Sequence, residues 1–166
     1  MTQYQIEVLI RLMLSDGLIS KIGNSLNTYF TITCSIKFKE FAYFIKSIFD
    51  SFLSNKGFYK NIIQSGPDSP YYKRITLACF TEYHNLFYLF NIETNKYTKI
   101  IPLNIEVLLT PIVMAFMIMG DGSYNKSRKV IRISTNSYTK NEVELLKTAF
   151  ENRFNILCSL ERAKKD

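Results

Sequence analysis

Two apolar, helix-like segments of this 166-residue chain end in the same way, on Asp-Gly, although they lie far apart. The first reads EVLIRLMLSDG, residues 7–17, and the second reads PIVMAFMIMGDG, residues 111–122. A single Asp-Gly after a helix is usually no more than a turn. Two copies, each followed by a polar and basic segment, indicate that the chain builds one carboxylate-ended helix twice, and hence an internal duplication.

The segments downstream of the two Asp-Gly pairs also resemble each other. Residues 30–52 align without gaps with residues 132–154, and the alignment pairs Thr33 with Thr135 and keeps apolar residues at helical spacing. An Asp-Gly helix, a strand-rich ribbon and an amphipathic helix therefore recur in the same order. This repeat predicts two homologous halves.

We place the first half at residues 1–100 and the second at residues 101–166. After the aligned segment the first half continues through a loop, a strand and a helix, whereas a short stretch follows Phe154. The second half is therefore predicted to be incomplete. Along the chain, the expected elements are helix 4–15, strand–turn–strand 18–38, helix 39–53, loop 54–70, strand 71–80, helix 81–91, connector 92–102, a helix up to about Met119, strands within 123–137 and helix 139–154, which is an α+β order.

Net charge and composition restrict the class of partner. The formal net charge is +7 and the pI is about 9.3, which favours a polyanion, nucleic acid first and an anionic membrane second. The apolar run of residues 105–120 is shorter than the roughly 20 residues of a bilayer span and contains Glu106 and Pro111. We therefore expect a buried helix and no membrane. No signal peptide is evident at the N-terminus.

The cysteine and histidine content disfavours zinc sites and disulfide frameworks. There are three cysteines, far apart, and one histidine, so a reducing compartment is expected. His84 is interpreted as a structural imidazole rather than a catalytic base, because no nucleophile motif accompanies it. The abundance of Ile, Phe, Tyr, Asn and Lys, without Trp, is typical of an AT-rich genome such as that of an organelle.

Two carboxylate-ended helices point to a metal site. If the helices pack around a pseudo-twofold axis, Asp16 and Asp121 come together, and two close carboxylates need protons or cations. Oxygen ligands without His or Cys suit Mg²⁺. Mg²⁺ held by few carboxylates keeps water ligands and accepts phosphate oxygens, which is the setting of metal-assisted phosphodiester hydrolysis.

The ribbons after the two aspartates are expected to contact nucleic acid, because basic strands beside a duplex reach phosphates and the major groove. The basic candidates are Lys21, Lys37, Lys73 and Arg74 in the first half and Lys126, Arg128, Lys129 and Arg132 in the second. The polar candidates for base contacts are Asn24, Ser25, Asn27, Thr31, Thr33, Ser134, Asn136 and Ser137. Taken singly, such residues are more often the solvated face of a strand.

At these residues the sequence resembles the LAGLIDADG homing endonucleases of the organellar, group I intron-encoded type. LIRLMLSDG, residues 9–17, and MAFMIMGDG, residues 114–122, fall on the nine-residue motif of this family. The stretch KIIPLNIEVLLTPIVMAFMIMGDGS, residues 99–123, resembles the segment around the family's second motif. The resemblance implies an αββαββα half repeated twice, with two antiparallel saddle-shaped sheets that grip DNA.

The resemblance further implies a monomeric endonuclease that makes a Mg²⁺-dependent double-strand cut in DNA at a long intron-homing site, and that is encoded in a mitochondrion or plastid. Carried over by position, Asp16 and Asp121 are the expected ligands of two or three divalent cations. The carbonyl groups of Ser15 and Gly120 are expected to join them. The catalytic basic residue near the metals has two candidates, Lys99 and Lys129.

The sequence departs from the family at the third motif position, where a small residue lets the two helices approach. That position holds Arg11 in the first copy and Phe116 in the second. Arg11 can extend to solvent, pair with Glu7, or mark a decaying motif. Other functions stay open: an intron RNA maturase or a catalytically inactive DNA-binding protein on the same fold, and an unrelated structural α+β protein.

Overall fold

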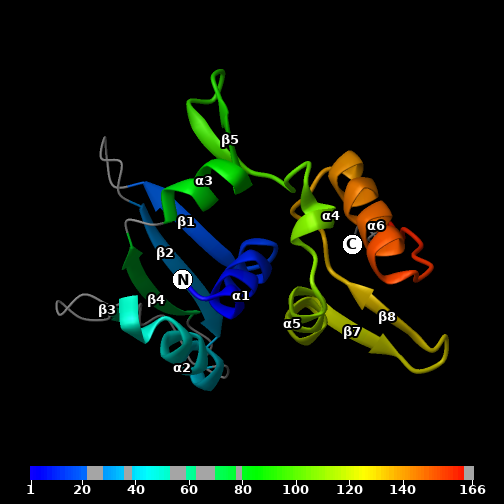
Figure 1. Ribbon diagram of the computed structural model, residues 1–166, viewed down its shortest axis with the longest axis horizontal. Helices are drawn as coiled ribbons and strands as arrows, with labels where there is room; N and C mark the ends of the chain where they lie inside the picture. Colours follow the sequence, from blue (N-terminus) through cyan, green and yellow to red (C-terminus); the bar gives the residue numbers. More distant parts are fainter. Residues whose placement is uncertain (22–27, 36–38, 53–58, 63–69, 78–79, 163–166) are drawn as a thin grey trace. The chain divides into compact units, whose positions relative to one another are not determined.

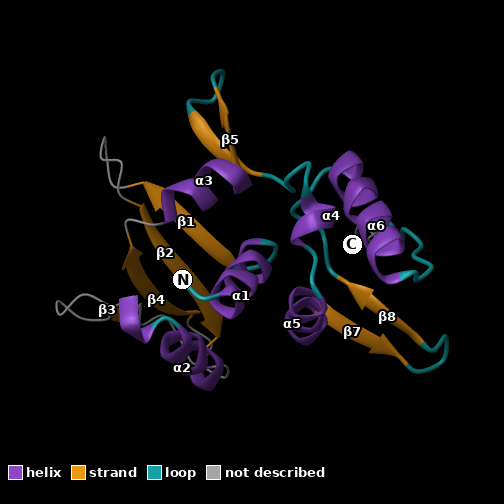
Figure 2. Ribbon diagram, viewed as in Figure 1, coloured by secondary structure: helices purple, strands orange, loops and turns teal. Residues whose placement is uncertain are grey.

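The computed structural model describes residues 1–21, 28–35, 39–52, 59–62, 70–77 and 80–162 of the chain. Contacts divide the chain into two compact units, Met1–Leu86 and Phe87–Asp166, and each is described by itself. The described strands form one four-stranded antiparallel sheet and two antiparallel hairpins (Figure 2). These elements agree with the predicted α+β class. The predicted division of the repeat at residue 100 stays a prediction.

The first unit has the order of elements that was predicted for one complete half. Its elements are α1 (Gln3–Met13), β1 (Gly17–Lys21), β2 (Thr28–Ser35), α2 (Lys39–Ile48), the 3₁₀ turn η2 (Asp50–Phe52), β3 (Tyr59–Ile62), β4 (Pro70–Leu77) and α3 (Thr81–Phe87). The sheet order is β1-β2-β4-β3, and Figure 1 shows α1, α2 and α3 on the same side of this sheet. This is an αββαββα unit.

Helix α1 has a well-defined start and is tied to helix α2. Thr2 and Gln5 form a capping box, in which the Gln5 amide donates to the Thr2 hydroxyl at 3.2 Å and the Thr2 amide donates to Gln5 Oε1 at 2.8 Å. The Gln5 side-chain amide also donates to the carbonyl of Ile48, the last residue of α2, at 2.7 Å. The motif helix is thereby fixed at its first turn.

Aromatic side chains make the core of the first unit. Phe30, Phe49 and Phe80 are fully buried, with ring centroids 5.8 to 6.5 Å apart. Phe30 on β2 alternates with the half-buried Thr31, as expected for a strand with one face on the core. Burial of a phenylalanine contributes about 1.5–3 kcal/mol. The cluster therefore anchors the hairpin that follows the first motif.

The second unit contains the second motif helix and its hairpin. Its elements are β5 (Tyr88–Asn91), β6 (Lys96–Lys99), α4 (Ile105–Leu108), α5 (Pro111–Asp121), β7 (Gly122–Asn125), β8 (Val130–Ile133) and α6 (Lys140–Phe154). Helix α4 contacts α6, and the buried residues Ile105, Leu109, Leu146 and Phe150 supply the core. Residues 155–162, which follow α6, form neither helix nor strand.

The predicted helix over residues 81–91 is wrong beyond Phe87. Helix α3 ends there, and the remaining residues form β5, which pairs with β6 inside the predicted connector. The side chain of Asn91 accepts from the Thr94 amide at 3.0 Å, and Asn95 has a φ of 52°, so polar residues close the hairpin turn. Aromatic residues of this segment favour a strand once the turn supplies a partner strand.

Other predicted boundaries are also wrong. The helix expected to run up to Met119 is divided into α4 and α5, because Pro111 lacks an amide hydrogen and begins a new helix. The Thr110 side chain caps this start by accepting from the Val113 amide at 3.2 Å. The loop predicted over residues 54–70 contains strand β3.

Helix α5 is buried along one stripe rather than throughout. Val113 and Met117 are buried, whereas Met119 is exposed. The helix predicted over residues 39–53 ends at Ile48 and is followed by η2. None of the helices in the described ranges has both the length and the apolar character that a bilayer crossing requires.

Candidate functional site

The first motif ends in a tight turn. Helix α1 ends at Met13, and the Leu14 amide continues its hydrogen bonding by donating to the Ile10 carbonyl at 3.0 Å. Asp16 is exposed and stands directly before Gly17, the first residue of β1. The Asp16 carboxylate group therefore belongs to the turn at the C-terminal end of the helix.

The second motif ends on Asp121, the last residue of α5. The Gly122 amide donates to the Ile118 carbonyl, and Gly122 begins β7. The Asp121 carbonyl accepts from the Ser134 amide at 3.0 Å. The end of this helix is thus tied to the residue that follows β8, and Asp121 is half-buried.

The glycine after each aspartate is required by the available space. A Cβ at Gly17 would lie 2.5 Å from the Leu12 carbonyl oxygen and 2.8 Å from the Phe30 ring. A Cβ at Gly122 would press on the Ile118 carbonyl group and lie 2.9 Å from Ile118 Cα. In both motifs the chain turns so sharply that the first strand residue packs against carbonyls of the last helical turn.

Each of these glycines opens an antiparallel hairpin. Gly17 pairs with Ile32 across β1 and β2, and Gly122 pairs with Ile133 across β7 and β8. A helix, an aspartate, a glycine and a hairpin thus follow one another in both units. The two aspartates belong to different units, and their approach to metal-sharing distance stays a prediction.

The polar groups at the two motif ends are oxygen donors. Each aspartate stands beside backbone carbonyls, those of Ser15 and Gly120 among them, at the C-terminal end of a helix. The aligned peptide dipoles of a helix give its C-terminal end a partial negative charge, which favours a cation. Carboxylate and carbonyl oxygens are the ligands that Mg²⁺ prefers. Over the described ranges, no three His, Cys, Asp or Glu side chains gather in a metal-binding group.

Lys99 is held in place through its backbone neighbours. It ends β6 directly opposite Tyr88 of β5. The amide that follows it donates to the Phe87 carbonyl at 2.8 Å, and the next amide, that of Ile101, donates to Glu142 Oε1 at 3.1 Å. The end of β6 is therefore fixed between its partner strand and the first turn of α6.

Glu142 joins this segment to the helix cap. Its Oε2 accepts from the Thr139 amide at 2.8 Å and from the Thr139 hydroxyl at 2.6 Å, as part of a capping box. Partial burial acts to raise the pKa of the Glu142 carboxyl, but hydrogen bonds from Thr139 and Ile101 outweigh it and lower the pKa below its usual value. Sequence reasoning missed this role, although Thr-x-x-Glu before an amphipathic helix is its signal.

Tyr138 lies within electrostatic reach of the second motif. Burial raises the pKa of the Tyr138 hydroxyl well above its usual range, and the charges of Glu142, Tyr88 and Asp121 add to the rise. The phenol therefore stays protonated at neutral pH. Tyr88, whose charge contributes to this rise, is also the cross-strand partner of Lys99. No sequence motif identifies Tyr138 or Tyr88.

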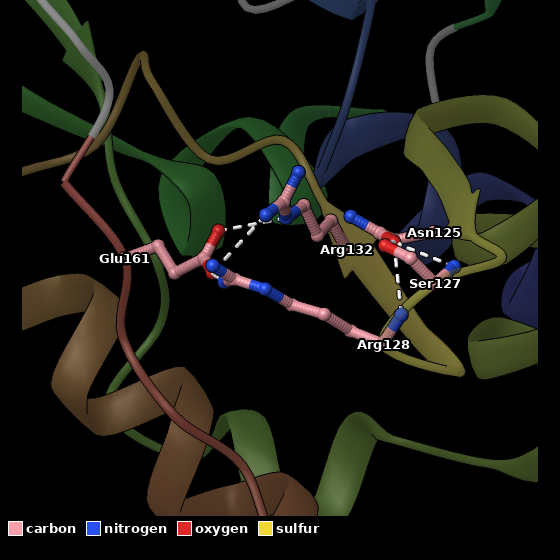
Figure 3. A network of polar contacts seen from close by, with 5 residues as sticks. All are labelled: Asn125, Ser127, Arg128, Arg132 and Glu161. Carbon is pink, nitrogen blue, oxygen red and sulfur yellow. Dashed lines mark hydrogen bonds and ion pairs between the residues drawn. The ribbon is translucent and has the colours of Figure 1, made fainter.

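The β7–β8 hairpin carries the basic side chains predicted for the second ribbon. Asn125 shapes its turn, because Asn125 Oδ1 accepts from the Ser127 and Arg128 amides at 3.1 Å and from the Ser127 hydroxyl at 2.8 Å (Figure 3). Lys129 has a φ of 54° and is exposed in this turn, at least about 13 Å along the strands from Asp121, because its neighbour Val130 pairs with Asn125, four residues after Asp121. This place separates Lys129 from the neighbourhood of the motif aspartate.

Two arginines of this hairpin meet Glu161, a residue of the segment after α6 (Figure 3). Arg132 Nε lies 2.7 Å from Glu161 Oε2, and Arg132 Nη2 donates to Glu161 Oε1 at 3.2 Å. Arg128 Nη1 donates to the same Oε1 at 3.1 Å. Sequence reasoning singled out both arginines but not the carboxylate, which is brought to them from a distant part of the chain.

The first ribbon is described in part. In register, Thr31 of β2 lies opposite Arg74 of β4, whereas Lys73 lies opposite Ile32. Of the other predicted contacts, Thr33 is on β2 and Lys21 ends β1. Four are exposed in the second unit: Lys126, Ser134, Asn136 and Ser137. Four lie outside the described residues: Asn24, Ser25, Asn27 and Lys37.

Arg11 is buried at the motif position where a small residue was expected. Its side chain is 3% exposed, and its guanidinium lies 5.8 Å from the centroid of the Phe41 ring of α2, which is a cation–π distance. Packing against α2, rather than extension to solvent, is therefore observed. Glu7 accepts from the Gln3 side chain at 3.1 Å.

Burial lowers the pKa of His84, which favours its structural interpretation.

Comparison with known proteins gives matches over most of the chain. The model of the LAGLIDADG DNA endonuclease family matches residues 6–166. Two curated relatives are cytochrome b mRNA maturases bI2. The Saccharomyces cerevisiae protein is 28% identical over 91 residues, 55% of this chain and 21% of the relative. The Debaryomyces hansenii protein is 28% identical over 110 residues, 66% of this chain and 36% of the relative.

A solved structure gives the corresponding likeness in three dimensions. The homing endonuclease I-WcaI bound to its DNA recognition sequence superposes with a TM-score of 0.77 at 22% identity, over 98% of this chain and 73% of that chain. This likeness confirms the predicted fold class. The chain spans about a fifth to about a third of the length of the curated relatives.

Proposed function

The chain belongs to the LAGLIDADG DNA endonuclease family, and we propose that it binds double-stranded DNA and cuts both strands at a long intron-homing site. The observation that best supports this function is the repeated motif end. In each unit an apolar helix leads to an aspartate and then to a glycine that opens a hairpin. One carboxylate from each unit suits a reaction that must be performed once on each strand of a duplex.

Asp16 and Asp121 are proposed as ligands of two or three divalent cations, with Mg²⁺ the expected ion. The carbonyl groups of Ser15 and Gly120 are proposed to complete the ligand set. These groups fit the ion because all are hard oxygen donors at helix C-terminal ends. When bound, such an ion activates a water molecule and stabilises the leaving oxygen of a phosphodiester.

Lys99 is proposed as the basic residue near the reacting phosphate. Its backbone is held by the β5–β6 ladder and by the Glu142 bond to Ile101. We place its ammonium near the proposed metal site, where it would offset the negative charge that develops on phosphate oxygens. Lys129, the other candidate, is proposed to contact the DNA backbone instead.

The two hairpins that follow the motifs are proposed to hold the duplex. The exposed basic side chains of the β7–β8 hairpin, Arg128 and Arg132 foremost, reach phosphates or base edges. The net charge of +7 supports a polyanionic partner. We further propose a monomer of organellar origin, in agreement with the AT-rich composition and with relatives named for cytochrome b mRNA.

The direct test is cleavage of a plasmid that carries the intronless form of the host gene, which is the gene whose intron would encode this protein. We expect linear product with MgCl₂ and none with EDTA. Intact plasmid under both conditions, with retained duplex binding, would identify a catalytically inactive DNA-binding protein instead. An intact plasmid without duplex binding would contradict the proposed function altogether.

A maturase is the second candidate, because both curated relatives are named cytochrome b mRNA maturases. In that case the basic hairpins would bind structured intron RNA and the aspartates would be dispensable. Splicing of the host intron in vitro, with and without the protein, distinguishes the two functions. A maturase accelerates splicing whether or not Asp16 and Asp121 are replaced by asparagine.

A further inference from the structure

The carboxylate of Glu161 occupies the two arginines that the second hairpin offers to a nucleic acid. Arg132 engages it with Nε at 2.7 Å and Nη2 at 3.2 Å, and Arg128 engages it with Nη1 at 3.1 Å (Figure 3). Glu161 comes from the segment after α6, far from the hairpin in sequence. Both guanidinium groups thus converge on one anion of the chain itself.

The geometry at Arg132 is the one that a phosphate would use. Two parallel N–H donors of a guanidinium fork match two oxygens of a carboxylate or of a phosphate equally well. A phosphate of the duplex therefore competes with Glu161 for the same donors, and the two anions cannot occupy them together. The two arginines thus present donors that fit a phosphate, and the carboxylate of Glu161 already occupies these donors.

The contact is weak enough for a duplex to displace. The side chains of Arg128, Arg132 and Glu161 are 66%, 45% and 47% exposed. Ion pairs with that exposure are screened by water and salt and stabilise a fold little. A duplex that makes several phosphate contacts elsewhere on the protein can therefore displace the carboxylate. A nucleic acid that makes few other contacts gains less binding free energy and displaces it less readily.

The hairpin turn does not depend on this contact for its shape. Asn125 Oδ1 already satisfies the amides of Ser127 and Arg128 and the Ser127 hydroxyl. The β7 and β8 ladder holds the strands on the other side of the turn. Removal of the Glu161 charge is therefore expected to leave the hairpin folded and to change chiefly what its arginines can bind.

We propose that Glu161 is an intramolecular competitor of nucleic-acid phosphate. It lowers the affinity of Arg128 and Arg132 for any duplex and so suppresses binding to DNA that offers few other contacts. The inference rests on the proposed function in one respect, that the β7–β8 hairpin contacts nucleic acid. It is independent of whether the chain cleaves DNA.

The test is duplex binding by the full chain, measured by fluorescence anisotropy with a labelled duplex of arbitrary sequence over a series of salt concentrations. The variant is Glu161→Gln, and the matched control is Glu144→Gln, which removes the same charge from an exposed pair with Lys140. We expect Glu161→Gln to bind several-fold more tightly than Glu144→Gln at low salt. A plot of the logarithm of its binding constant against the logarithm of the salt concentration should be steeper by about 1 to 2, because each added phosphate contact contributes about 0.9 to this slope.

The same measurement in an Arg128→Gln, Arg132→Gln background completes the design. There, Glu161→Gln should bind no more tightly than Glu144→Gln, because the arginines that it frees are absent. Equal affinities of the two single variants would overturn the inference, and so would weaker binding by Glu161→Gln, which would make Glu161 a brace for the arginines. If the arginine changes leave wild-type binding unaltered, the proposed role of the hairpin itself fails.

Discussion

Gly17 and Gly122 show why the Asp-Gly pair recurs. The reason for the glycine is not an unusual backbone conformation. Gly122, for example, has a φ of −83° and a ψ of 142°, which any residue adopts. What each excludes is a Cβ, because carbonyl groups of the preceding helix stand where it would lie. The pair was recognised in the sequence as a helix stop, and the packing that requires it became visible only in three dimensions.

Gly122→Ala is expected to lower the free energy of unfolding by about 1–3 kcal/mol, because the end of α5 and the start of β7 must separate to admit the methyl group. Urea unfolding followed by circular dichroism measures the change. Ser123→Ala, at the exposed next position, is the control and should unfold within about 0.5 kcal/mol of the wild type. Equal midpoints for the two variants would refute the packing argument.

Glu142→Ala is expected to cost about 1–2 kcal/mol at pH 7, since it removes the Glu142 half of the capping box of α6 and the acceptor of the Ile101 amide. A carboxyl whose pKa is lowered by folding binds its proton less tightly in the folded state. Its contribution is therefore complete above the unfolded pKa of about 4.3 and is lost as the pH falls through the folded value.

Unfolding of the wild type and of Glu142→Ala at pH 7 and at about pH 3 tests this linkage. The difference in stability should shrink in acid. Glu144→Ala, which removes an exposed partner of Lys140 in the same helix, should show a smaller effect at pH 7. A difference that is the same at both pH values would show that the carboxylate charge is not what matters.

At the scale of elements, the helices and hairpins that carry local signals were predictable. Helix α6 has a capping pattern and an apolar stripe, and the β1–β2 and β7–β8 hairpins have turn residues between strand-like runs. Strand β5 was predicted as helix because its identity depends on pairing with β6, and a short aromatic run fits either structure. The contact of Glu161 with the hairpin arginines could not be predicted, because it depends on where the chain returns after α6.

The turn of the β7–β8 hairpin provides a prediction at this scale. Asn125→Ala removes an acceptor of three hydrogen bonds, and we expect a loss of about 0.5–1.5 kcal/mol, confined to the hairpin. Hydrogen–deuterium exchange of residues 122–133 should become faster while α6 is unchanged. Asn136→Ala, at an exposed position after β8, is the control; faster exchange in both variants would argue against a specific role for Asn125.

For the whole molecule, the duplication is the feature that joins fold and function. Each unit by itself offers one aspartate at a motif-helix end with a hairpin directly after it, which in the proposed function is half of the site that cuts a duplex. The proposed function requires both halves, because each strand of the duplex needs its own activated water and its own leaving oxygen. Changes at either aspartate should therefore abolish double-strand cleavage, even though the other unit is untouched.

The most direct measurement compares three variants, Asp16→Asn, Asp121→Asn and Asp50→Asn, with the wild type. It measures how fast each one linearises the plasmid with the intronless host gene in the presence of Mg²⁺. Asp50 is an exposed partner of Lys46 and supplies the same chemical change outside the motifs. We predict a fall of at least about 100-fold for either motif variant, the scale of losing an electrostatic contact to the reacting group, with duplex binding retained and Asp50→Asn as active as the wild type. Linear product from both motif variants at the wild-type rate would contradict the proposed metal site.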